Sequence, residues 1–173
     1  LSTIGIQAND RSLEFYVNTA NQRFAHELLS EKLLLNGQLK VGFFPGAAWD
    51  YKRWPVDRFA EVADRIVRQY NASILLFGGP SEAELLGQVR DSMRTDPILF
   101  ETNLQIGQLA ALISSCDQFV SNDTGPAHIA VALGIPTIVL FGVTNHLKFG
   151  PFDPMHTVIR YGDSLDRSKG REM

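Results

Sequence analysis

The feature of the sequence that most restricts the fold is a series of short apolar runs, each followed by small or turn-forming residues. Apolar residues follow one another within most of each run, which indicates strands that are buried on both faces. The runs occupy Val41–Phe44, Ser73–Phe77, Ile98–Phe100, Gln118–Ser121 and Thr137–Phe141, with a sixth strand expected at Thr157–Arg160. Strands of this kind predict a parallel sheet, because helices on both sides are needed to cover them.

Amphipathic segments separate these runs, as a sheet covered by helices requires. Between the first two runs, Val56–Tyr70 places apolar residues such as Phe59 and Ile66 on one face and charged residues on the other. Pro55 stands where the start of a helix tolerates proline. Further helices are expected at Asn18–Leu35, Ser81–Arg94, Leu104–Ser115 and Pro126–Leu133, the last closed by Gly134. The alternation of strand and helix predicts an α/β fold.

Composition narrows the class of protein. The 173 residues carry 16 lysines and arginines against 19 aspartates and glutamates, and this net charge of −3 argues against charge-driven nucleic-acid binding. Cys116 is the only cysteine, which excludes an intrachain disulfide and a thiolate metal cluster. The 4 histidines lack the spacing of a metal site, so no metal is expected. No apolar run reaches the roughly 18 residues that a membrane span needs.

The ends of the chain differ from its regular centre. Residue 1 is leucine, and the first residues are like those in the middle of a protein, so we expect the chain to be a piece of a longer one. Residues 1–39, with an extended segment at Leu13–Val17, are expected to form an interdomain connection and packing arm. Residues 40–162 are predicted to form one domain, and residues 163–173 a tail.

Small and polar residues follow the predicted strands, and parallel strands bring these carboxyl ends to one edge of the sheet, where ligands bind. After the first strand come Pro45, Gly46, Ala47 and Ala48, and then the basic pair Lys52-Arg53. Small residues let backbone N–H groups approach an anion, and the basic pair supplies positive charge for a phosphate. A tight turn followed by a solvated basic pair is the alternative interpretation.

A second polar segment, Asn122–His128, joins the fourth predicted strand to a helix. The N-terminus of that helix offers free N–H groups and a positive dipole end, to which Thr124 and His128 add hydrogen-bond donors. These features predict an anion site with Asp123 beside it. Alternatively, Asp123 or Thr124 only caps the helix, and His128 is only a packing residue.

A third segment, Gly78–Glu82, combines two glycines with an acidic residue. The glycines allow a ligand to approach closely, and Glu82 can accept hydrogen bonds from the two hydroxyls of a ribose. A helix N-terminal acid that stabilises the dipole is the alternative role for Glu82. Neither GxGxxG nor GxxxxGK[ST] is present, so the ordinary dinucleotide fingerprint and the P-loop are both absent.

Together these segments resemble the family 9 glycosyltransferases, whose best-known members are the lipopolysaccharide heptosyltransferases. The resemblance rests on FFPGAAWDYKRWPVDRFAEVA, ILLFGGPSE, LAALISSCDQFVSNDTGPAHIAVALGIPTIVLFG and VTNHLKFGPFDP, which cover about residues 41–154 in the family's order. It implies a Rossmann-like α/β domain with a parallel sheet and helices on both faces. Such a domain is the carboxyl-terminal half of the two-domain GT-B arrangement, which binds the nucleotide-sugar donor.

The resemblance also implies roles for individual residues. Lys52 contacts the donor phosphates, and His128 with its neighbours surrounds the diphosphate. Asp123 holds or orients the sugar, and Glu82 lies near the ribose. Many members have Ser or Thr where this chain has Ala48, so one side-chain bond to phosphate is missing here. The donor-binding residues implied in this way are Lys52, Glu82, Asp123, Thr124, Gly125 and His128, with Gly46, Ala47 and Ala48 forming the phosphate loop.

The implied reaction is the inverting transfer of a sugar, heptose from ADP-heptose, to a lipopolysaccharide core or other glycan acceptor. No cofactor is implied. In this family the amino-terminal domain binds the acceptor and supplies an aspartate base, so we expect the base outside this chain and no transfer by the chain alone. We expect a cytoplasmic location, with peripheral contact to the inner membrane as an alternative. A nucleotide-sugar epimerase and a nucleotide-binding module without catalysis remain as alternative functions.

Overall fold

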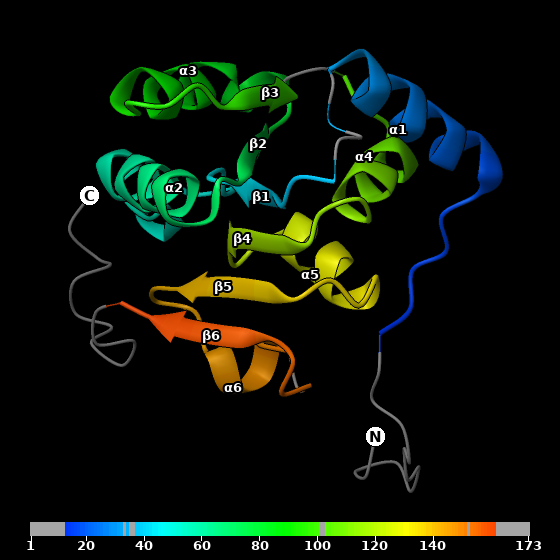
Figure 1. The fold of residues 1–173 in the computed structure, drawn as a ribbon. Coiled ribbons are helices and arrows are strands. Elements are labelled where there is room, and N and C mark those ends of the chain that lie inside the picture. The colour runs from blue at the N-terminus through cyan, green and yellow to red at the C-terminus, as the bar shows by residue number, and fades with distance from the viewer. Residues whose placement is uncertain (1–12, 33, 35–36, 101–102, 152, 162–173) are drawn as a thin grey trace, which may run out of the picture.

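A parallel six-stranded sheet forms the centre of the protein (Figure 1). The computed structural model describes residues 13–32, 34, 37–100, 103–151 and 153–161. The strand order is β3-β2-β1-β4-β5-β6, and every neighbouring pair is parallel. The strands are β1 (Lys40–Phe44), β2 (Ser73–Phe77), β3 (Ile98–Phe100), β4 (Gln118–Asn122), β5 (Thr137–Phe141) and β6 (Thr157–Arg160). The predicted parallel sheet is therefore confirmed.

Helices cover both faces of this sheet, as the apolar runs predicted. They are α1 (Thr19–Glu31), α2 (Val56–Tyr70), α3 (Ala83–Ser92), α4 (Ile106–Ile113), α5 (Gly125–Ala132) and α6 (His146–Phe149), with 3₁₀ turns η2 (Asp50–Lys52) and η3 (Pro80–Glu82). Successive residues of a strand face opposite sides. In β2, Ile74 and Leu76 belong to the core under α2 and α3, whereas Leu75 and Phe77 belong to the core under α1, α4 and α5.

The structure moves several predicted helix and strand ends. The helix expected at Ser81–Arg94 starts only at Ala83, because Pro80–Glu82 form a 3₁₀ turn that Glu82 closes by accepting the Gly79 N–H at 2.9 Å. The first helix ends at Glu31, short of the expected Leu35. The fourth strand extends one residue further, to Asn122. Gly134 follows α5 with φ of +70°, which confirms its predicted role at the helix end.

The described part of the predicted amino-terminal arm packs on the domain. Helix α1 lies against α4, and its Ala25 and Leu29 are buried in the same core as Phe77 (Figure 1). Leu13–Val17 forms no regular strand, although the Phe15 N–H donates to Ala132 O at 3.2 Å. Residues 1–12 and the tail at 163–173 lie outside the described residues. None of the described helices combines the length and the apolar character needed to cross a membrane.

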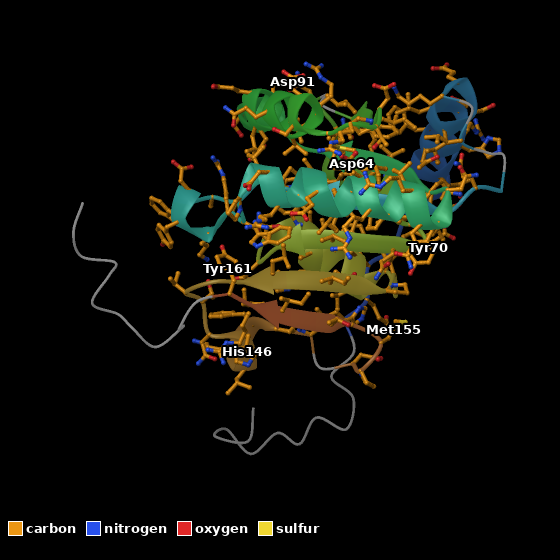
Figure 2. All side chains as sticks on the ribbon, turned by 60° about the vertical axis from the view of Figure 1, so that its left-hand side comes forward. Asp64, Tyr70, Asp91, His146, Met155 and Tyr161 are labelled. Atoms are coloured by element: carbon orange, nitrogen blue, oxygen red, sulfur yellow. The ribbon has the colours of Figure 1, made fainter. Side chains whose placement is uncertain are left out.

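A buried carboxylate joins the two helices on the α2 face (Figure 2). Asp64 of α2 accepts hydrogen bonds from the backbone N–H groups of Arg94 and Thr95, each at 3.0 Å, and from the Thr95 hydroxyl at 2.7 Å. Burial alone raises the pKa of Asp64, but the hydrogen bonds from the Thr95 hydroxyl and these N–H groups outweigh it and lower the pKa. The charged carboxylate therefore ties the end of α3 to α2.

We expect Asp64→Asn to destabilise the protein by about 1–3 kcal/mol at pH 7, because the amide loses the charge and turns an N–H donor toward donors that two carboxylate oxygens had accepted. Because the pKa of Asp64 is lower in the folded than in the unfolded protein, its charge stabilises the fold at pH values above the unfolded-state pKa. This stabilisation is lost as the pH falls through the folded-state pKa. The stability difference between the two proteins should therefore shrink as the pH is lowered below about 4. Urea unfolding between pH 3 and 7 measures it, and a difference that stays constant would contradict this role of the charge.

Candidate functional site

The direction of chain progression through the sheet reverses between β1 and β4. From β1 the chain proceeds outward to β2 and β3, and it then returns to the other side of β1 to form β4, β5 and β6. The loops that leave β1 and β4 consequently run to opposite sides, and it is between two such loops, at the carboxyl edge, that open α/β sheets form their ligand crevice. Because β1 and β4 are neighbours, the topology brings the β1–α2 loop and the β4–α5 turn together. These two segments contain most of the residues predicted to bind the donor.

A fully buried asparagine holds the two segments against each other. The Asn122 amide nitrogen Nδ2 donates to Pro45 O at 2.8 Å and to Gly46 O at 3.2 Å. Its Oδ1 accepts the Trp54 N–H at 3.0 Å. Asn122 lies in the predicted polar segment Asn122–His128, but the sequence by itself predicts no role for it. The only signal was a polar residue at the end of an apolar run, and such a residue is normally taken for the start of a loop.

Charged side chains gather at the crevice. Lys52 Nζ lies 3.7 Å from Asp123 Oδ2, and His128 Nε2 lies 3.8 Å from Asp123 Oδ1. The Asp123 side chain is only 9% exposed, whereas those of Lys52 and His128 are 25% and 46% exposed. The structure therefore brings together three of the predicted residues, with the carboxylate between two groups that can carry positive charge.

A second lysine–aspartate pair lies at the opposite end of the same two strands. Lys40 Nζ lies 4.0 Å from Asp117 Oδ2, where β1 and β4 begin. The Asp117 side chain is 49% exposed, in contrast to that of Asp123. The two pairs have the same chemistry, but only the one formed by Lys52 adjoins the crevice. The pair at Lys40 is therefore an internal control for experiments on the site.

The structure gives Arg53 a different task from the phosphate contact that the sequence suggested. Its Nη1 lies 2.6 Å from Asp50 Oδ1, and its Nη2 donates to Ala47 O at 3.1 Å. Arg53 thus bridges the β1–α2 loop internally and fixes its shape. Ala47 is buried, while Ala48 is exposed at the outside of the loop. The charge available to an anion from this loop is that of Lys52.

Glu82 reaches the same loop from the neighbouring strand end. A Cβ added at Gly46 would lie only 2.8 Å from Glu82 Cγ, so the absence of a side chain at Gly46 lets the two segments meet. One carboxylate oxygen accepts the Gly79 N–H, so Glu82 closes the turn before α3, a role that the sequence did not predict. The ribose contact of Glu82 stays a prediction, and its position next to Gly46 is compatible with it.

The N-terminus of α5 has no side-chain cap. Thr124 is the N-cap residue, but its hydroxyl contacts Ser121 Oγ at 3.1 Å and Asn122 O at 3.3 Å instead of a helix N–H. Simple capping by Thr124 or Asp123 is therefore not what the structure shows. A Cβ added at Gly125 would meet nothing within 4 Å, so the space before the helix is open. The first N–H groups of α5 remain available to a ligand.

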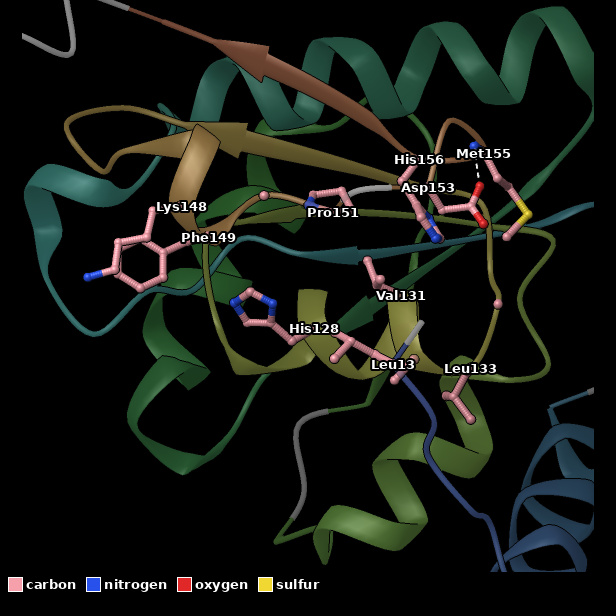
Figure 3. Close-up of a pocket in the computed structure, with 13 residues that line it drawn as sticks. Leu13, His128, Val131, Leu133, Lys148, Phe149, Pro151, Asp153, Met155 and His156 are labelled. Atoms are coloured by element: carbon pink, nitrogen blue, oxygen red, sulfur yellow. Dashed lines mark hydrogen bonds between the residues drawn. The ribbon is translucent and has the colours of Figure 1, made fainter. Parts of the chain in front are cut away.

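A hollow of about 740 Å³ lies beside α5 and shares only His128 with the predicted donor residues (Figure 3). Its other walls include Leu13, Val131, Lys148 and His156. Burial lowers the pKa of His156 although the nearby Asp153 carboxylate acts in the opposite direction. The hollow thus extends away from the Lys52–Asp123 pair.

The described residues contain no group of three or more His, Cys, Asp or Glu side chains placed to hold a metal ion.

Comparison with known proteins shows the family of the chain. Residues 2–172 match the sequence profile of glycosyltransferase family 9 (heptosyltransferase). The chain belongs to glycosyltransferase family 9. Within this family, the chain is 28% identical over 173 residues to the lipopolysaccharide core heptosyltransferase OpsX of Haemophilus influenzae, an alignment that covers 97% of this chain and 48% of that protein.

Solved structures show the same relationship. The crystal structure of the glycosyl transferase family 9 from Veillonella parvula superposes with a TM-score of 0.84 at 32% identity, covering 98% of this chain and 49% of that one. The E. coli heptosyltransferase WaaC shares the fold, with a TM-score of 0.62 at 23% identity over 80% of this chain and 41% of that one. The chain thus spans about half the length of the relatives it matches. Its fold is that of one half of a GT-B glycosyltransferase.

We expect Asp123→Asn to bind ADP about two- to tenfold more tightly than the unaltered chain, because a carboxylate beside the diphosphate repels it. The substitution also releases Lys52, which Asp123 holds in the free protein. Asp117→Asn is the matched control, because it neutralises the aspartate at the other end of β4 and should leave ADP affinity unchanged. Calorimetry on the three proteins measures this. Weaker ADP binding by Asp123→Asn would show that Asp123 itself supports the nucleotide.

Proposed function

We propose that this chain is the donor-binding half of an inverting heptosyltransferase that uses ADP-heptose and a lipopolysaccharide core acceptor. The observation that carries the proposal is the grouping of Lys52, Asp123 and His128 in front of the uncapped N-terminus of α5. These groups lie at the switch point of a parallel sheet, where such folds bind nucleotides. The names of the relatives support a heptosyltransferase, and the family match gives no support to an epimerase.

The arrangement suits a diphosphate better than a neutral ligand. Free N–H groups and the positive dipole end of α5 favour an anion, and Lys52 adds a full charge from the facing loop. When a sugar is transferred, negative charge develops on the departing nucleoside diphosphate. Fixed donors aimed at such charge are typically worth roughly 3–4 kcal/mol each in the transition state. Lys52, His128 and the α5 N–H groups would stabilise the leaving group in this way.

The remaining predicted residues fit the two ends of such a donor. Glu82 and Gly46 lie on the β2 side of the crevice, where the ribose would lie next to the carboxylate. Asp123 lies on the β4 side between Lys52 and His128, where it would orient hydroxyls of the sugar. The donor would therefore span the β1–α2 loop, with its diphosphate between the two ends.

The attacking hydroxyl also needs a base on the face of the sugar opposite the leaving group. Asp123 is paired with cationic groups on the leaving-group side, and Glu82 closes a turn through one of its oxygens. Neither placement suits a base for the acceptor. We therefore assign the base and the acceptor site to a second domain, as in the GT-B arrangement. A nucleotide-binding module without catalysis would share the donor site but lack this partner domain.

The two lysine–aspartate pairs provide the decisive experiment. Lys52→Ala should weaken binding of ADP by about 1.5–3 kcal/mol, the range for charge-assisted hydrogen bonds. It should leave the binding of adenosine nearly unchanged, because Lys52 faces the phosphates. Lys40→Ala removes the same kind of side chain at the amino end of β1 and should change neither affinity. Calorimetric titration of the unaltered chain and both variants gives the comparison.

The outcomes separate the possible roles of Lys52. Equal losses for ADP and adenosine would show that Lys52 is structural, and equal losses in both variants would show that charge at a distance is responsible. Titration of UDP and GDP in parallel tests the choice of nucleotide, since a preference for ADP is expected. The WaaC structure contains ADP-2-deoxy-2-fluoro heptose, so this analogue is a suitable probe for the sugar end.

A further inference from the structure

Asn122 uses both N–H donors and the oxygen of its side-chain amide to bond backbone groups of the facing loop. Its two N–H donors are directed at Pro45 O and Gly46 O, and its oxygen accepts the Trp54 N–H. The side chain is fully buried, so water cannot replace these bonds. Asn122 also immediately precedes Asp123, and it therefore connects the β4–α5 turn with both ends of the β1–α2 loop.

The bonds to two successive carbonyls fix the direction of two N–H groups. A trans peptide is planar, and its C=O and N–H point in opposite directions. The described chain contains no cis peptide. When Pro45 O and Gly46 O both point at Asn122, the N–H groups of Gly46 and Ala47 must point away from it. Two successive N–H groups with a shared direction form a concave site for an anion.

These two N–H groups need a partner that the described part of the chain does not supply. Gly46 and Ala47 are both buried, but neither N–H donates a hydrogen bond to any described residue. Buried backbone N–H groups are almost always paired, because leaving one unpaired costs as much as a lost hydrogen bond. A ligand anion would satisfy both at once.

We propose that Asn122 is a positioning residue that aims the Gly46 and Ala47 N–H groups at the diphosphate of the donor. The proposal rests on the proposed function, because that function supplies the diphosphate. Through Oδ1, the same side chain also holds Trp54, two residues after Lys52. Asn122 thereby sets both the backbone donors and the lysine of one anion site, although it touches no ligand itself.

The internal bonds of Arg53 make this positioning effective. Arg53 joins Asp50 and Ala47 O, so the two halves of the loop are bonded to each other. Through its bonds to Pro45 O and the Trp54 N–H, Asn122 then connects the β1–α2 loop to β4. Without the Asn122 bonds, the peptide units at Gly46 and Ala47 can rotate, and an anion must order them again when it binds.

The test compares Asn122→Leu with Thr137→Val in the 173-residue chain. Both substitutions nearly preserve side-chain size and remove a buried hydrogen-bonding group of the sheet, since the Thr137 hydroxyl donates to Ile135 O at the amino end of β5. Asn122→Leu should weaken ADP binding at least about tenfold and leave adenosine binding within about twofold, as expected when hydrogen bonds to a charged group are lost. Thr137→Val should change neither affinity, whatever it costs in stability.

A spectroscopic measurement separates positioning from a merely structural role. In the unaltered chain, ADP but not adenosine should shift the amide proton resonances of Gly46 and Ala47 downfield, because both N–H groups then bond to phosphate oxygen. In Asn122→Leu, saturating ADP should no longer produce this shift. If that variant fails to fold, Asn122→Ser serves instead, since serine stays polar but is too short to bridge both carbonyls.

The failures are distinguishable. Bound ADP that leaves the Gly46 and Ala47 amides unmoved in the unaltered chain would overturn the role of Asn122 without affecting the proposed function. Equal losses of ADP and adenosine in Asn122→Leu, or unchanged ADP affinity, would overturn it as well. If the unaltered chain does not bind ADP at all, the proposed function fails, and the role assigned to Asn122 fails with it.

Discussion

The parallel pairing of β1 with both β2 and β4 is the constraint on which the rest of the structure depends. It places the loops after β1 and β4 side by side although 77 residues separate Pro45 from Asn122. Hydrogen bonds from the Asn122 amide then join those loops directly. Lys52, Asp123 and the start of α5 meet because of this pairing, and no local segment could bring them together.

The same sheet shows how position decides what a charged pair can do. Lys40 with Asp117 and Lys52 with Asp123 lie at opposite ends of β1 and β4. At the amino end, Asp117 is half exposed and also accepts the Lys40 N–H, so the pair joins two strand starts. At the carboxyl end, the Asp123 side chain is only 9% exposed and lies beside a helix N-terminus and a histidine. Of these two ends, only the carboxyl end places a helix dipole, a lysine and a histidine where they could act together on the anion of the proposed donor.

Much of the fold was predictable, because each strand is an apolar run and each long helix is amphipathic. The predictions failed where the hydrophobic pattern carries no information about where an element begins or ends. Glu82 closes a 3₁₀ turn by bonding Gly79, which delays α3. The short helix α6 was not predicted, because four residues carry too little periodicity. For the site, Lys52, Asp123 and His128 were predicted together and lie together, whereas the bonds of Arg53 to Asp50 and Ala47 within the loop were not predicted.

The sequence by itself determined the fold class, the family and the two segments that form the crevice, since these follow from the residue pattern along the chain. Only the tertiary structure decided which polar residues face the crevice and which hold it in place. Asn122 and Asp123 are neighbours in the chain, yet the Asn122 side chain bonds backbone carbonyls, whereas the Asp123 side chain lies beside Lys52. Successive residues at the end of a strand point in opposite directions, and only the paired strand shows what lies on each side.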